Sequence, residues 1–225
     1  MEIRPASIDS CSLPVFLGLD VGKTRDRAAW VGVGASWVGI VPKRLGVAEL
    51  PVWSVVVCEQ APLGTPYAGL AARTRELATA FAKGGWPVLV AVDATGIGAA
   101  VVEDLRADPS DAEILAITCH GGKQVTGEWP DLHVPKTVLV AALDTVLRRN
   151  ALKVMSTLPA AEVLNAQLKA YTAKFKPEGR GRVGHVSFEA RHERDHDDTV
   201  SAAQLSLYSG AQWWAISRSR VPGPQ

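Results

Sequence analysis

Three acidic sites, each at the boundary of an apolar or helical segment, constrain the fold of this chain most. Asp20 ends the apolar run VFLGLD, Asp93 ends VLVAVD, and the pair Asp197 and Asp198 precedes the helical segment TVSAAQLSLY. Carboxylates at the polar ends of buried strands gather at one edge of a sheet, and clustered carboxylates are ligands that hard divalent cations prefer. The pattern predicts an α/β fold with a site for Mg²⁺ or Mn²⁺, and it favours metal-dependent phosphoryl chemistry.

Length and charge limit the class of protein. The 225 residues predict one domain, which we expect over 14–214, with flexible segments at 1–13 and 215–225. The 24 basic and 23 acidic residues nearly cancel, so any DNA contact must come from local patches. No apolar run reaches the roughly 18 to 20 residues that span a bilayer. The three cysteines lack metal-ligand spacing. We therefore expect a cytosolic protein that is neither secreted nor membrane-bound.

The order of the expected elements indicates the topology. Helical spacing predicts helices at 67–83, 97–106, 137–149, 160–174 and 199–214, and apolar runs predict strands at 15–20, 28–33, 52–59, 87–92 and 114–119. A short edge strand is expected at 186–189. This order is ribonuclease H-like: three antiparallel strands come first, and two parallel strands with interleaved helices follow. It forms a central mixed five-stranded sheet flanked by helices. Its first and fourth strands are parallel neighbours, which would place Asp20 beside Asp93 at the ligand-binding edge.

These carboxylates permit two-metal catalysis. Carboxylates within several ångströms repel one another unless a cation neutralises them, and in two-metal sites the ions lie about 3.5–4 Å apart. Asp20 would bridge two ions, with Asp93 and either Asp197 or Asp198 holding one ion each. Taken singly, Asp93 could be a turn former and the Asp pair a helix cap. Their common order on this scaffold favours the metal site.

Three further residues are auxiliary candidates. Asp26 is either an extra ligand or an ordinary turn carboxylate. Lys136 is either a phosphate contact or a solvated residue at a helix start. His196 is a general base, a metal neighbour or a surface histidine.

The string Gly22-Lys23-Thr24 does not form a Walker A loop. That loop requires a glycine five residues before Gly22, where Leu17 stands. The strings GLDVGKT and DATGIG also resemble the phosphate loops of actin-like ATPases. Those enzymes close two large subdomains over the nucleotide, for which this chain is short.

Over about residues 15–208 the chain resembles the nuclease domain of the large terminase subunit of tailed bacteriophages. The resemblance rests on GLDVGKTRDRAAW, VAVDATGIGAAVVEDL, HVPKTVLVAALDTVL and FEARHERDHDDTVSAAQLSLY. It implies an endonuclease that uses Mg²⁺ or Mn²⁺ to cut concatemeric double-stranded DNA during genome packaging, in the cytoplasm of the host bacterium. Asp20, Asp93, Asp197 and Asp198 match the catalytic carboxylates, and Asp26 matches a nearby acidic position. Ser201 departs from relatives that carry another acid there.

The resemblance also sets expectations about partners. We expect no ATPase domain in this chain, and as partners a separate packaging ATPase, a small terminase subunit or a portal. The basic segment KPEGRGR, with Lys176, Arg180 and Arg182, is either a DNA-gripping hairpin or a solvated connection. Two other functions remain open: a Holliday-junction resolvase-like nuclease, and a non-catalytic DNA-binding or assembly module.

Overall fold

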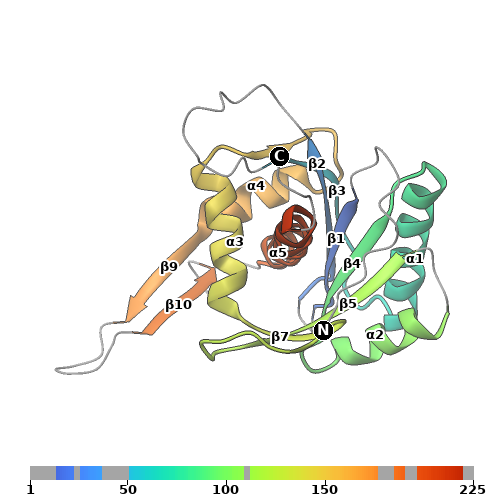
Figure 1. The fold of residues 1–225 in the computed structure, drawn as a ribbon, viewed down its shortest axis with the longest axis horizontal. Coiled ribbons are helices and arrows are strands. Elements are labelled where there is room, and N and C mark those ends of the chain that lie inside the picture. Colours follow the sequence, from blue (N-terminus) through green and yellow to red (C-terminus); the bar gives the residue numbers. More distant parts are fainter. Residues whose placement is uncertain are drawn as a thin grey trace.

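A mixed sheet forms the centre of the molecule (Figure 1). The computed structural model describes residues 14–22, 26–36, 51–108, 112–176, 185–190 and 197–219. Within them the sheet has eight strands in the order β6-β7-β5-β4-β1-β2-β3-β8. Their bounds are β1 Val15–Asp20, β2 Ala29–Ser36, β3 Val52–Gln60, β4 Val88–Asp93, β5 Ala112–His120, β6 Thr126–Glu128, β7 Asp131–Pro135 and β8 Leu152–Val154.

Helices cover both faces of this sheet. Figure 1 shows α1 and α2 on one side, and α5 on the other side between the sheet and α3. The helices are α1 Tyr67–Lys83, α2 Gly98–Ala107, α3 Lys136–Arg148, α4 Ala161–Ala170 and α5 Asp198–Ser219. A separate hairpin pairs β9 (Tyr171–Lys176) with β10 (His185–Ala190). No helix in the described part of the chain is long and apolar enough to cross a membrane.

Alternation along the central strands builds two apolar cores. In β1, Phe16 packs into the core on the α5 side, whereas Leu17 and Leu19 pack into the core beneath α1 and α2. In β4, Ala91 faces α5, and its neighbours in sequence face the opposite core. Successive strand residues point to opposite faces, so each face of the sheet is fixed by every second residue.

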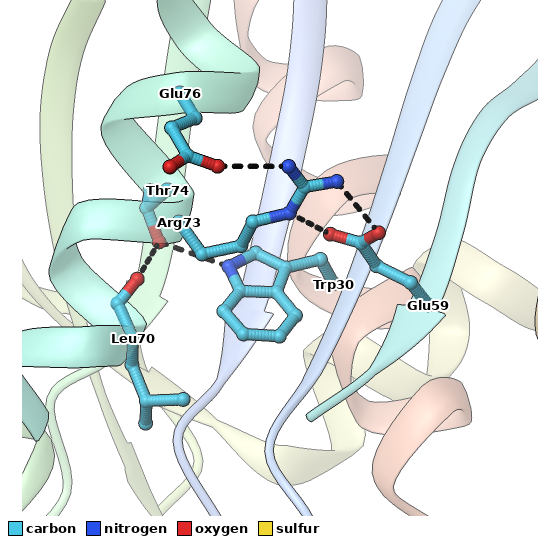
Figure 2. Close-up of polar contacts among 6 residues, drawn as sticks. All are labelled: Trp30, Glu59, Leu70, Arg73, Thr74 and Glu76. Carbon is cyan, nitrogen blue, oxygen red and sulfur yellow. Dashed lines mark hydrogen bonds and ion pairs between the residues drawn. The ribbon is translucent and has the colours of Figure 1, made fainter. Parts of the chain in front are cut away.

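Polar contacts attach α1 to the sheet (Figure 2). The Trp30 indole N–H of β2 donates to the Thr74 hydroxyl at 2.9 Å, and that hydroxyl donates to the Leu70 carbonyl at 2.8 Å. The Arg73 guanidinium binds Glu59 at the end of β3, with its Nε donating to Oε1 at 2.8 Å. These contacts set the distance between α1 and strands β2 and β3.

The predicted fold class is confirmed, with a larger sheet than expected. The order β3-β2-β1-β4-β5 contains three antiparallel and then two parallel strands, and β1 runs parallel to β4. Strands β7 and β6 extend the sheet beyond β5, and β8 extends it beyond β3. These additions are only three to five residues long, too short for a clear alternating pattern.

The helix expected at 160–174 is wrong in its last turn. Helix α4 ends at Ala170, and Tyr171 adopts an extended backbone that begins β9. The run YTAKFK alternates in the manner of a strand, and it pairs with β10. The strand expected at 186–189 is therefore present, but in this hairpin. Helix α5 continues beyond the expected residue 214, to Ser219. Residues 1–13 and 220–225 lie outside the described residues.

Candidate active site

Four parallel strands end at one edge of the sheet and carry the candidate residues there. Strand register pairs Leu19 of β1 with Val92 of β4, Asp93 of β4 with Ile117 of β5, and His120 of β5 with Pro135 of β7. Asp20, Asp93, Cys119 and Lys136 therefore follow one another along this edge. The predicted adjacency of β1 and β4, with an aspartate ending each strand, is confirmed.

The carboxylates lie on the α5 side of the sheet. Asp20 is two residues beyond Gly18 in β1, and Asp93 is two residues beyond Ala91, whose side chain belongs to the core beneath α5. Cys119 packs against the same core. Because side chains at i and i+2 of a strand share a face, these three groups form a row on one face.

Gly18 allows the final helix to reach this row. A Cβ atom at Gly18 would lie 2.0 Å from the Ala202 carbonyl oxygen and 2.9 Å from the Ser206 nitrogen. The backbone of α5 thus packs directly on β1. This close approach brings the start of α5, with its buried Asp198, toward Asp20, two residues further along the strand.

Asp20 is in an environment that disfavours its charged form. Its pKa is raised from 3.8 to about 8. Burial is the largest cause of this shift, and the charge of Asp93 is the second. Asp198 and Asp197 act in the same direction, whereas the Gly22 N–H, which donates to Asp20 Oδ1 at 3.3 Å, opposes it. Gly22 has a φ of +66°, which permits this tight turn. The dominant charges around Asp20 are therefore like charges, which a bound cation would neutralise.

Asp93 also has the structural role of a turn former. The Thr95 N–H donates to Asp93 Oδ1 at 2.9 Å, and the Thr95 hydroxyl accepts from the Cys119 N–H at 3.0 Å. A Cβ atom at Gly98 would lie 1.8 Å from the Asp93 carbonyl oxygen, so only glycine lets α2 begin so close to β4. The turn uses one carboxylate oxygen and fixes the side chain at the edge.

Asp198 has a partner that the sequence did not reveal. The Gln60 amide Nε2 donates to Asp198 Oδ2 at 3.4 Å. The register of β2 with β3 shifts by one residue, from Gly32 opposite Val57 to Val33 opposite Val55. This bulge changes which residues of β3 face α5, so that Gln60 lies on the α5 side and Glu59 on the α1 side.

Asp197 is the N-cap residue of α5. Its carbonyl accepts the first helical hydrogen bond, from Ser201 N–H at 2.8 Å. The Thr199 N–H, one of the amides at the helix start that have no acceptor within the helix, donates to Gln167 Oε1 of α4 at 3.0 Å, and the Thr199 hydroxyl donates to the same oxygen. Gln167 was not among the predicted residues, because its role depends on the packing of α4 against α5.

Lys136 lies at the same edge, exposed at the first residue of α3. Burial raises the pKa of the Cys119 thiol to about 12; Asp93 and Asp20 add to this shift, and Lys136 opposes it. The sequence had not suggested Cys119. The strand order places Cys119 of β5 between Asp93 of β4 and Lys136, which follows β7.

Of the remaining predicted residues, Asp26 lines a separate cleft, and most of the others lie outside the described residues. Asp26 lines a cleft of about 380 Å³ on the α1 side, together with Gly22 and Tyr67. His196, Arg180 and Arg182 lie outside the described residues, and Lys176 is described only as the last residue of β9.

The donor set fits a hard divalent cation. It consists of carboxylate oxygens, and in the described residues no ion pair joins Asp20 or Asp93 to a basic side chain. Within the same residues no three histidine, cysteine, aspartate or glutamate side chains are grouped closely enough to enclose an ion. A metal ion would therefore have to draw these carboxylates together, which relief of their repulsion favours.

The core strand order and the placement of α5 define a ribonuclease H-like α/β fold. Over 88% of the chain it is similar to the large terminase nuclease of the thermophilic phage G20c solved with bound zinc, at 17% identity and TM-score 0.50, covering 81% of that chain. The nuclease domain of the SPP1 large terminase, solved with bound manganese, matches 87% of the chain at 9% identity and TM-score 0.50, with 86% of that domain covered.

The HK97 large terminase gives a third match, with a TM-score of 0.52 at 14% identity. It covers 88% of this chain, which spans 40% of the HK97 protein. No family model matches the sequence, and no curated protein is similar to it in sequence. The structural likenesses establish that the chain has the fold of phage large-terminase nuclease domains, as the sequence resemblance predicted.

Proposed function

We propose that this protein is a metal-dependent endonuclease that cuts double-stranded DNA, of the type found in phage large terminases. The observation that carries the proposal is a set of four aspartates, which we call the carboxylate row. Asp20 and Asp93 end parallel neighbouring strands, and Asp197 and Asp198 begin the helix that packs over them. The likeness to terminase nuclease structures supports the same assignment.

The cofactor would be two Mg²⁺ or Mn²⁺ ions, and Asp20, Asp93 and the Asp197–Asp198 pair would hold them. Bound ions of this kind supply an activated water and stabilise the leaving oxygen of a phosphodiester. Among the chain's own groups, the Gly22 N–H orients the Asp20 carboxylate, and the Gln60 amide orients Asp198. The ammonium of Lys136, exposed beside the row, would contact a DNA phosphate.

The substrate would be concatemeric viral DNA, cut during genome packaging in the cytoplasm of the host cell. The chain corresponds to 40% of the HK97 large terminase. By the likeness to large terminases, its partners would be components of a packaging complex: a packaging ATPase, a small terminase subunit or a portal. The paired strands β9 and β10 flank the segment that carries Arg180 and Arg182, and this segment with Lys176 would grip the DNA backbone.

Cleavage of supercoiled plasmid by the purified chain tests this proposal. Nicked and linear products should form with Mn²⁺ or Mg²⁺, should be absent with EDTA, and should be lost in a folded Asp20→Asn protein. A folded wild-type chain that cuts no DNA with either metal would contradict the enzyme assignment and favour a non-catalytic assembly module. Strong preference for four-way junctions over duplex would indicate a Holliday-junction resolvase instead.

A further inference from the structure

The start of α5 is capped from another helix. Its N-cap residue is Asp197, whose carbonyl accepts from Ser201 N–H. The amide of Thr199, the second residue of the helix, donates instead to the side chain of Gln167 in α4. Thr199 is fully buried, so this amide has no access to water and requires a protein acceptor.

An N-cap aspartate ordinarily supplies that acceptor itself. Its carboxylate bonds the N–H of the second or third helical residue, here Thr199 or Val200, and this bond stabilises a helix by about 1 kcal/mol. A carboxylate bound in this way points back over its own helix. Gln167 Oε1 takes the Thr199 N–H, so this amide does not need the Asp197 carboxylate as its acceptor.

The Asp197 carboxylate is directed elsewhere. It accepts no hydrogen bond from Thr199, whose N–H and hydroxyl both bond Gln167, and among the described groups its charge adds to the raised pKa of Asp20, after burial and the charge of Asp93. Burial raises the pKa of Tyr171, the residue after α4, to about 12, and the charge of Asp197 adds to this shift. Asp197 thus stands uncapped at the start of the helix that packs on β1, and its charge disfavours the charged form of Asp20.

We propose that Gln167 is a positioning residue that caps α5 in place of Asp197 and so leaves the Asp197 carboxylate at the carboxylate row. As far as metal binding is concerned, the inference rests on the proposed function. Without the Gln167 oxygen, Asp197 would turn to cap Thr199, because a buried unbonded N–H costs more than a changed rotamer. The carboxylate would then be withdrawn from the row.

A double-mutant cycle of Gln167→Met and Asp197→Ala tests this exchange without metal. Methionine keeps the length of the glutamine side chain and removes its oxygen. In urea unfolding with EDTA, Asp197→Ala should change the folding equilibrium constant less than about twofold in the native background. In the Gln167→Met background it should lower the constant about fivefold, the effect of losing one N-cap bond.

Mn²⁺ titration by calorimetry is the second readout, made well below the unfolding temperature of each variant. Gln167→Met should weaken Mn²⁺ binding about fivefold when Asp197 is present and should have no further effect in the Asp197→Ala background. Thr74→Val is the matched control. It removes the buried bond from Trp30 on the opposite face of the sheet, so it should lower stability and leave Mn²⁺ affinity unchanged.

The outcomes separate the two proposals. An additive stability cycle, or equal Mn²⁺ affinities for wild type and Gln167→Met, would overturn the positioning role. A coupled cycle in a chain that binds no Mn²⁺ would retain the cap exchange and overturn the proposed function.

Discussion

Two carboxylate groups at the same end of the sheet differ in how their charge is balanced. Glu59, at the end of β3, accepts two hydrogen bonds from Arg73, at 2.8 and 2.9 Å, and Arg73 also binds Glu76 (Figure 2). For Asp20, at the end of β1, burial and then the charges of Asp93, Asp198 and Asp197 raise the pKa. One group has a guanidinium partner, and the other has further carboxylates.

The comparison separates a carboxylate that is paired within the fold from one that is a candidate metal ligand. The hydrogen bonds of Glu59, followed by those of Glu76, raise the pKa of Arg73, so the pair is satisfied within the fold. Such a partly exposed ion pair contributes about 0–1 kcal/mol. The half-buried Asp20 group keeps an electrostatic cost that no described basic side chain relieves, which is what a site for an external cation requires.

The largest difference between the two groups should appear in DNA cleavage. Asp93→Asn should lower the cleavage rate at least about 10³-fold, because it removes a charge that only the bound metal would use. Glu59→Gln, the matched change in the paired group, should alter the rate less than about twofold. Initial rates of plasmid nicking in Mn²⁺ measure both. Similar losses of cleavage rate in Asp93→Asn and Glu59→Gln would contradict the distinction between the two carboxylate groups.

A second difference should appear in the pH dependence of stability without metal. The pKa of Asp20 is raised from 3.8 to about 8, so over this interval the folded chain binds a proton that the unfolded chain has lost. Stability should therefore fall as the pH rises from about 4 to about 8, by ~1 kcal/mol per unit. Urea unfolding in EDTA should show this slope in wild type and Glu59→Gln, and a flatter one in Asp20→Asn. Equal slopes in all three proteins would argue against a buried, proton-binding Asp20.

A third test concerns the packing of α5 on β1, which brings Asp197 and Asp198 toward Asp20 and Asp93. Gly18→Ala should destabilise the fold by about 3 kcal/mol, because the new methyl group would overlap the Ala202 carbonyl of α5. Gly34→Ala in the neighbouring strand β2 is the control, since a Cβ atom there meets nothing within 4 Å. Thermal unfolding compares the two. A tolerated alanine at Gly18 would show that α5 does not pack on β1 as described.

The smallest effect should come from removing Arg73, the partner of Glu59. Arg73→Gln removes both ion pairs of an arginine whose side chain is 44% exposed, and it should cost at most about 1 kcal/mol. Cleavage should stay at the wild-type rate. Chemical denaturation and plasmid nicking check the two statements, and a marked loss of cleavage would connect the α1 side to the site.

Local sequence was enough to predict where the two central aspartates lie in the fold. Each ends an apolar run that forms a buried strand, and in the ribonuclease H-like order those strands are parallel neighbours. The period of two then fixes the face on which Asp20 and Asp93 lie. The start of α5 was predicted to within one residue, because the acidic pair marks a helix boundary.

The supporting residues depend on contacts that no local pattern encodes. Gln60 reaches Asp198 because of a bulge in the pairing of β2 with β3. Gln167 reaches Thr199 because α4 ends beside the start of α5, 32 positions along the chain. The last turn of the helix expected at 160–174 became a strand because a distant segment, β10, pairs with it. Tertiary partners decided each of these cases.

Thermal unfolding as a function of Mn²⁺ concentration at neutral pH tests the central claim most directly. A ligand that binds only the folded state stabilises it in proportion to the logarithm of its concentration above Kd. The unfolding temperature of wild type and Glu59→Gln should rise steadily with Mn²⁺, and that of Asp20→Asn should not. An unchanged wild-type temperature, or an equal rise in Asp20→Asn, would show that the carboxylate row is not a metal site.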